Sequence, residues 1–157
     1  MHTTTNLVRV KRNLAKEFFA CHEHLGDMGL GVWHWGLEFN GALASVVSYG
    51  TTCFCTNRGW LGKLAKTASC GVVQLCRGGT SPWAPKGTGS FLISQANRAI
   101  ANLKGPLLIV AYATAELGEI GTIYQACNAT YTGLSNPKGQ ANYIIGGKLM
   151  SGWSVRK

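Results

Sequence analysis

The strongest constraint on the fold is an Asn-Gly pair, Asn40-Gly41, that separates two strand-like runs, VWHWGLEF and ALASVVSYG. A type I′ turn needs positive φ at both central residues, and Asn-Gly adopts that conformation readily. The sequence therefore predicts an antiparallel hairpin over residues 32–50. Because side chains alternate along a strand, three large side chains of the first arm are expected to face the core: Trp33, Trp35 and Phe39.

The spacing of apolar residues predicts the other elements. Repeats of three and four indicate a helix over 8–24, closed by Glu23 and His24 before Gly26, and a second helix over 90–103. Short apolar runs predict strands at 71–76, ending at Arg77, and at 107–111. The weaker pattern of 51–67 indicates a basic surface segment, and one or two strands are expected within 141–153. The sequence thus predicts a single domain over 1–157, with a mixed α/β (α+β) fold and a partly antiparallel central sheet flanked by helices.

The charge balance favours a polyanionic partner. Fifteen Lys and Arg residues against six Asp and Glu residues give a formal net charge of +9. Nucleic acid, a phosphorylated cofactor and anionic lipid all fit this charge, and a basic surface kept for solubility is the alternative. Four of the six acids form two close pairs, Glu23 with Asp27 and Glu116 with Glu119.

The sequence contains no signal for export or for membrane insertion. No apolar run approaches the ~20 residues that span a bilayer, and the basic start MHTTTNLVRVKRN has no apolar core behind it. We therefore expect a cytoplasmic location and no membrane partner. The six cysteines are expected to be reduced thiols, because the pair Cys53 and Cys55 has no second pair at zinc spacing.

A possible anion site follows the strand at 107–111. The chain continues through Gly118 and Gly121 to a helix expected to begin at Thr122, whose hydroxyl can cap it and which runs on through Ala126. A strand that leads through glycines to a helix N-terminus leaves backbone N–H groups available to an anion. We therefore predict cofactor contacts at Gly118, Gly121 and Thr122.

The literal sequence of this region carries a family resemblance. Its string LLIVAYATAELGEIGTIYQACNATYTG, together with HEHLG, WGLEFNGALASVVSYG, VVQLCR and SFLISQANRAI, resembles the Mom-type phage DNA-modification proteins, a branch of the GNAT acyltransferase-like fold. The matching pieces are colinear over about residues 22–133. The resemblance implies an enzyme that transfers an acyl or carbamoylmethyl-type group to adenine in duplex DNA and so protects phage DNA from restriction. Duplex DNA and a small-molecule donor are then its partners, and the host cytoplasm is its location.

Three ionisable positions depart from the family's pattern. The family usually has His-Tyr where this chain has Glu23 and His24, Asp where it has Thr114, and His where it has Glu119. Carboxylates at 23 and 119 can still act as a base or a metal ligand, whereas Thr114 keeps only a hydroxyl. The substrate or the donor is therefore expected to differ from that of better-known members.

The resemblance implies a catalytic set of Glu23, His24, Glu119 and Tyr124. Either carboxylate can act as the base, and the phenol can donate a proton or orient the substrate, although a core tyrosine is the alternative. Substrate contacts are predicted at Arg77, Ser90 and Thr114. The guanidinium of Arg77 suits a bidentate anion, whereas Ser90 is equally suited to be a helix N-cap.

The cofactor stays open. Acetyl-coenzyme A is possible, but Glu116 and Glu119 repel its phosphates. A metal ion held by the HEH run is possible as well, yet adjacent helical residues face different directions, so no metal ligand is assigned. Two further alternatives are an acetyl-coenzyme A-dependent N-acetyltransferase acting on a small amine or a premodified base, and an inert nucleic-acid-binding module. A homodimer is compatible with each.

Overall fold

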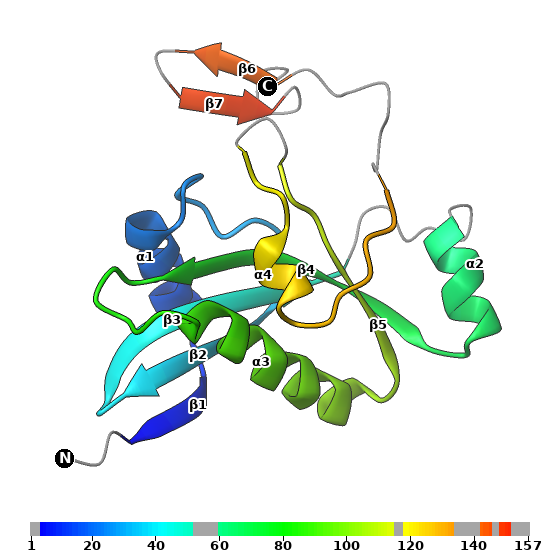
Figure 1. Cartoon of the computed structure of the whole chain (residues 1–157), viewed down its shortest axis with the longest axis horizontal. Helices are drawn as coiled ribbons and strands as arrows, with labels where there is room; N and C mark the ends of the chain where they lie inside the picture. The colour runs from blue at the N-terminus through cyan, green and yellow to red at the C-terminus, as the bar shows by residue number, and fades with distance from the viewer. Residues whose placement is uncertain (1–3, 52–59, 115–117, 134–141, 146–147, 152–157) are drawn as a thin grey trace.

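The computed structural model describes residues 4–51, 60–114, 118–133, 142–145 and 148–151 (Figure 1). Along the chain the elements are β1 (Thr5–Arg9), α1 (Arg12–His22), β2 (Trp33–Phe39), β3 (Ala42–Gly50), α2 (Trp60–Thr67), β4 (Gly71–Thr80), α3 (Thr88–Lys104), β5 (Leu107–Ala111), α4 (Thr122–Gln125), β6 (Asn142–Ile145) and β7 (Lys148–Ser151). A five-stranded sheet has the order β1-β2-β3-β4-β5, and β6 and β7 form a separate pair. The pairs β1/β2, β2/β3 and β3/β4 are antiparallel, and the pair β4/β5 is parallel. The predicted mixed, partly antiparallel sheet with flanking helices is confirmed.

The predicted hairpin is β2 and β3. Asn40 and Gly41 have φ of 51° and 82°, as a type I′ turn requires, and they leave Phe39 paired with Ala42. Trp35 is buried, and Trp33 and Phe39 are half-buried against the same core. The prediction that these three rings face the core is confirmed.

Each face of the large sheet is covered by a helix. On one face, α3 packs Leu92, Ala96 and Ile100 against strand residues that include Leu37 and Tyr49. On the other face, α1 packs three buried side chains against β3, namely Ala15, Phe18 and Phe19. The neighbours Val46 and Val47 of β3 belong to opposite cores, as the alternation of a strand requires. The sheet is therefore the middle layer between α1 and α3.

The sheet opens between β4 and β5. Their last pair is Leu75 with Ala111, but β4 continues to Thr80 while β5 ends at Ala111. Residues 77–80 of β4 therefore extend beyond the end of β5. The short helix α4 lies over this opening, in front of β4 in Figure 1, and makes contacts with α3. This opening positions the candidate site.

Three predicted boundaries were wrong. The first helix begins at Arg12, because residues 5–9 form β1 and pair with β2 in the register Thr5 to Phe39. It ends at His22, so Glu23 is the C-cap and His24 lies outside the helix. Strand β4 does not end at Arg77, because Gly78 and Gly79 still pair with β3.

The start of α4 also differs from the prediction. Its N-cap is Gly121 at φ 72°, no side chain caps it, and it ends at Gln125. The hydroxyl of Thr122 is therefore not a cap. The expected surface segment at 51–67 contains α2, which has a buried Ala65, and residues 52–59 lie outside the described residues.

The described cysteines, Cys21, Cys70, Cys76 and Cys127, form no disulfide with one another. Cys53 and Cys55 lie outside the described residues. Within the part of the chain that the structure describes, no helix is long and apolar enough to cross a membrane.

Candidate active site

An open cleft of about 250 Å³ lies at the gap between β4 and α4. Its walls come from the last residue of α1, from β3, from β4, from the first turns of α3 and from the segment 119–124. The titratable side chains on these walls are His22, Glu119 and Tyr124. An acid and a phenol from one short segment thus face the same cleft.

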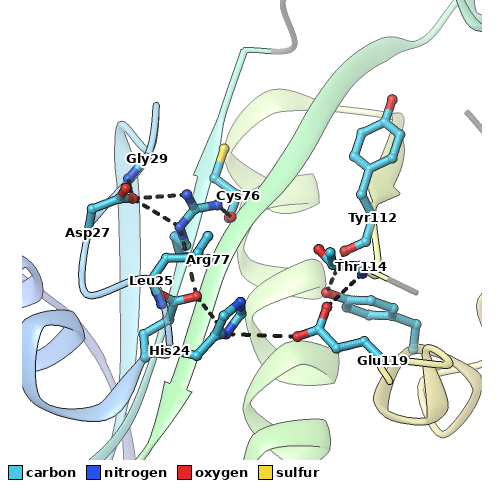
Figure 2. A network of polar contacts seen from close by, with 11 residues as sticks. His24, Leu25, Asp27, Gly29, Cys76, Arg77, Tyr112, Thr114 and Glu119 are labelled. Atoms are coloured by element: carbon cyan, nitrogen blue, oxygen red, sulfur yellow. Dashed lines mark hydrogen bonds and ion pairs between the residues drawn. The ribbon is translucent and has the colours of Figure 1, made fainter. Parts of the chain in front are cut away.

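A chain of polar contacts leads from this cleft into the loop after α1 (Figure 2). His24 Nδ1 lies 3.9 Å from Glu119 Oε1 and 3.2 Å from Glu23 Oε1. Glu23 has a side chain only 5% exposed, and its other oxygen accepts a 2.8 Å hydrogen bond from the N–H of Leu25. His24 and Glu119 are 44% and 39% exposed. The structure therefore brings Glu23, His24 and Glu119 together, with the buried acid behind and the accessible acid at the cleft.

Arg77 braces the loop that carries Glu23. Its Nε and Nη2 donate to Asp27 Oδ1 at 3.1 and 2.9 Å, and its Nη1 donates to the carbonyl of Cys76 at 2.8 Å. Nε also lies 3.9 Å from Glu23 Oε1. Asp27 in turn accepts a 2.8 Å bond from the N–H of Gly29. All three guanidinium nitrogens thus make bonds within the protein, a role that the prediction of a substrate contact did not include.

Glu119 holds its own loop in place. Its Oε2 accepts a 2.7 Å bond from the N–H of Thr114, and its own N–H donates to the carbonyl of Thr114 at 3.3 Å. Thr114 therefore joins the cluster through its backbone, whereas the sequence predicted a substrate contact there. These two bonds fix the position of the Glu119 carboxylate although Glu119 lies outside any helix or strand.

Tyr124 is a neutral hydrogen-bond donor at this site. Burial raises the pKa of its phenol, the carboxylate of Glu119 raises it further, and the nearby charge of Arg77 acts in the opposite direction. Its Oη donates a long bond of 3.4 Å to the carbonyl of Tyr112. A raised pKa keeps the proton on the phenol at neutral pH, so Tyr124 can give a proton but cannot take one.

A second hollow of about 260 Å³ adjoins the same segment. It is lined by Ala113 and by residues 118–124, and it shares Glu119, Ile123 and Tyr124 with the first cleft. The three predicted cofactor residues, Gly118, Gly121 and Thr122, all line this hollow. Since α4 has only four residues, its dipole adds little to the attraction of an anion.

The comparisons with known proteins agree with this architecture. The sequence profile of the Mom protein family matches residues 6–155. The chain belongs to the Mom protein family. No curated protein sequence matches the chain at a significant level. Among solved structures, an aminoglycoside N-acetyltransferase, AAC(6')-Iy, in complex with coenzyme A is similar, at 12% sequence identity over 87% of this chain and 94% of that one, with a TM-score of 0.56. This Mom-family chain therefore has the fold of a GNAT acetyltransferase.

One feature of this Mom-family site was not predicted from the sequence, namely the start of α3. Gly87 is the N-cap at φ 89°, and Gly89 lines the first cleft. At Gly89 a Cβ would lie 3.1 Å from both Ile123 Cδ1 and Thr80 Oγ1, so glycine suits this crowded position. The sequence contains the pattern that could have predicted this feature, because a strand, a glycine and a helix follow one another here as they do at 107–122. With 17 residues, α3 is the longer of the two helices, so its N-terminus is the better place for an anion.

The predicted substrate contact at Ser90 has less support in the geometry. Ser90 does not line either hollow; its Oγ donates to the carbonyl of Gly87 at 3.0 Å, and it is not the N-cap. No group of three His, Cys, Asp or Glu residues is arranged to hold a metal ion within the described part of the chain. Glu116 lies outside that part.

Proposed function

We propose that this Mom-family chain is a DNA base-modifying transferase that moves an acyl or carbamoylmethyl-type group from a small-molecule donor to adenine in duplex DNA, and so protects phage DNA from restriction. The observation that carries the proposal is the pairing of Glu119 and Tyr124 on one cleft in a member of this family. The net charge of +9 supports a DNA substrate.

Glu119 is the better of the two candidate bases. Glu23 is 5% exposed, and its two oxygens lie against His24 and the N–H of Leu25. Glu119 is 39% exposed and lines the cleft. As the exocyclic nitrogen of adenine forms its bond to the transferred carbon, it loses a proton to Glu119, and the bond between that carbon and the leaving group breaks. Tyr124 gives its proton to the leaving group.

The size of the cleft supports a small reacting group. Ligand pockets commonly enclose ~300–1,000 Å³, and this cleft has about 250 Å³. A single base fits such a volume, whereas a base pair in a duplex does not. Enzymes that act on a base in a duplex turn it out of the stack, and we propose the same here.

The test is mass spectrometry of nucleosides from cells that express the protein. Wild-type protein is expected to produce a modified adenosine, and Tyr124→Phe is expected to reduce it by about a hundredfold, since positioned acids and bases contribute ~10²–10⁴-fold. Tyr131→Phe is the matched control, because Tyr131 is 78% exposed and lines neither hollow. Unmodified nucleosides from folded, well-expressed wild-type protein would refute the proposal and would favour the inert nucleic-acid-binding module.

A coenzyme A-dependent N-acetyltransferase is the second candidate, and the start of α3 favours it. Gly89 in the first turn of α3 lines the cleft, and the exposed Lys86 directly precedes the N-cap Gly87, so a helix N-terminus and a cation adjoin each other in the chain. They would hold the phosphates of coenzyme A, which supplies an acetyl group as its thioester. Glu119, on another wall of the same cleft, disfavours phosphates near itself. Calorimetry separates the candidates: tight binding of coenzyme A that Lys86→Glu weakens, together with unmodified nucleosides, would support the second one.

A further inference from the structure

Ile120 has an exposure that packing does not explain. Its side chain is 79% exposed, more than any other large hydrophobic side chain that the structure describes. It directly follows Glu119, which faces the first cleft, and it lines the second hollow. Ile123, which is 41% exposed, lines the same hollow. A large exposed apolar side chain thus directly follows Glu119 in the chain and lines the hollow that shares Glu119, Ile123 and Tyr124 with the proposed base-binding cleft.

Hydrogen bonds on both sides of Ile120 fix the backbone so that its side chain faces solvent. Gly118 and Gly121 on either side have φ of 75° and 72°, a left-handed conformation that glycine adopts without strain. The bonds between Glu119 and Thr114 fix the residue before Ile120. The side chain of Gln125 donates to the carbonyl of Ile120 at 3.4 Å. The backbone is therefore tied on both sides of an apolar side chain that faces solvent.

We propose that Ile120 is a wedge that enters the base stack of duplex DNA and fills the place left by the target base, while that base turns into the cleft beside Glu119 and Tyr124. Proteins that distort DNA insert Ile, Leu, Met or Phe between base steps in this way. The net charge of +9 makes a polyanion a better occupant than an apolar protein surface. The inference rests on the proposed function, because it takes the base as the substrate.

The test compares paired and unpaired target bases. Purified protein, supplied with a protein-free extract of the expressing cells as the source of the donor, acts on a duplex that carries the mapped target base opposite its partner, or opposite an abasic site. Ile120→Ala is expected to slow modification of the paired target by tenfold or more and of the unpaired target by less than threefold, because an unpaired base leaves the stack at lower cost. Ile120→Met, which keeps an apolar wedge, is expected to restore modification of the paired target.

Leu103→Ala is the matched control. Leu103 is 58% exposed near the C-terminal end of α3, whereas Gly89 at the other end lines the cleft. With a rise of 1.5 Å per residue, roughly 21 Å separates the two ends. The control is expected to modify both substrates at the wild-type rate. Equal losses on the two substrates in Ile120→Ala, or no loss on either, would overturn the wedge.

A binding measurement separates the wedge from the chemistry. With 2-aminopurine at the target position, fluorescence rises when the base leaves the stack, and no donor is needed. Wild-type protein is expected to raise the signal and Ile120→Ala is not. If Ile120→Ala raises it as wild type does while DNA is still modified, the wedge fails and the proposed function stands. If wild type raises it, Ile120→Ala does not, and no nucleoside is modified, the wedge stands and the proposed function fails.

Discussion

Glu119→Gln separates the chemistry of the cleft from the stability of the fold. The substitution removes the charge but keeps the size, and the amide oxygen still accepts the bond from the N–H of Thr114, which is 2.7 Å long in wild type. The contact that is lost is the pair with His24 at 3.9 Å, in which the side chains are 44% and 39% exposed. Exposed pairs of this kind contribute ~0–1 kcal/mol. The melting temperature is therefore expected to fall by less than about 4 °C.

The activity is expected to fall far more. If Glu119 takes the proton from the attacking nitrogen, its loss costs about 10²–10⁴-fold in rate, and the neutral amide cannot replace it. The charge also raises the pKa of Tyr124, so that pKa should shift downward in the variant. A titration of phenolate absorbance in the near ultraviolet detects that shift, with Tyr124→Phe identifying the signal.

The assay is the yield of modified nucleoside per unit of folded protein, alongside thermal unfolding. Glu17→Gln makes the same change of charge on an exposed position of α1 and should behave as wild type. Retention of about a third or more of the wild-type yield would refute the role of Glu119 as base. An equal loss in Glu17→Gln would show that net charge, and not the position of this carboxylate, governs the activity.

Three further substitutions test the surrounding fold. Burial lowers the pKa of His34 below 6.5, so the neutral imidazole stabilises the fold fully above pH 6.5, and this stabilisation is lost as pH falls through the folded-state pKa. In His34→Gln, urea unfolding at a series of pH values should show a smaller loss of unfolding free energy over that range. Tyr49→Phe leaves Asn97 Oδ1 without the 2.6 Å bond from the phenol and should cost ~1–3 kcal/mol of unfolding free energy, a result contradicted by an unchanged urea midpoint. In Arg77→Lys the lysine cannot keep both bonds to Asp27. The yield of modified nucleoside should fall about tenfold, because the loop that carries Glu23 is held less firmly. The free energy of unfolding should fall by less than ~1 kcal/mol, because Asp27 is 61% exposed.

Local codes made much of the fold predictable. The hairpin follows from Asn40 and Gly41, since the turn conformation is decided within two residues. The helix over 90–103 and the strand over 107–111 follow from apolar spacing and differ from the structure by a few residues at most. Strand β1 was missed because its pattern is short and its partner lies some thirty residues away, in the register Thr5 to Phe39. Pairing at that distance leaves no local signal.

Of the candidate site, the residues could be predicted from the sequence, but most of their contacts could not. Family resemblance pointed to Glu23, His24, Glu119 and Tyr124, and their contacts depend on how two separate segments, the residues just after α1 and the segment 119–124, are placed relative to each other. The bracing of Arg77 by Asp27 was not predictable, because 50 residues separate them. The start of α3 was missed for another reason: residues 78–89 are rich in glycine and proline, a composition typical of a loop, and they hide both the end of β4 at Thr80 and the start of α3 at Thr88.

The lengths of the contacts indicate which atoms of the network have capacity left for a substrate. Behind the cleft the bonds are short, at 2.8 Å from Leu25 to Glu23 and 2.9 Å from Arg77 to Asp27. At the cleft, Glu119 Oε2 accepts a short bond of 2.7 Å from the N–H of Thr114. The contacts of Glu119 Oε1 with His24 and of Tyr124 Oη with a carbonyl are long, at 3.9 and 3.4 Å. A 3.9 Å separation is longer than a hydrogen bond. Catalytic contacts commonly shorten only when the substrate binds, so the rigid part of the network holds the loop while Glu119 Oε1 and Tyr124 Oη keep their bonding capacity for the reacting groups.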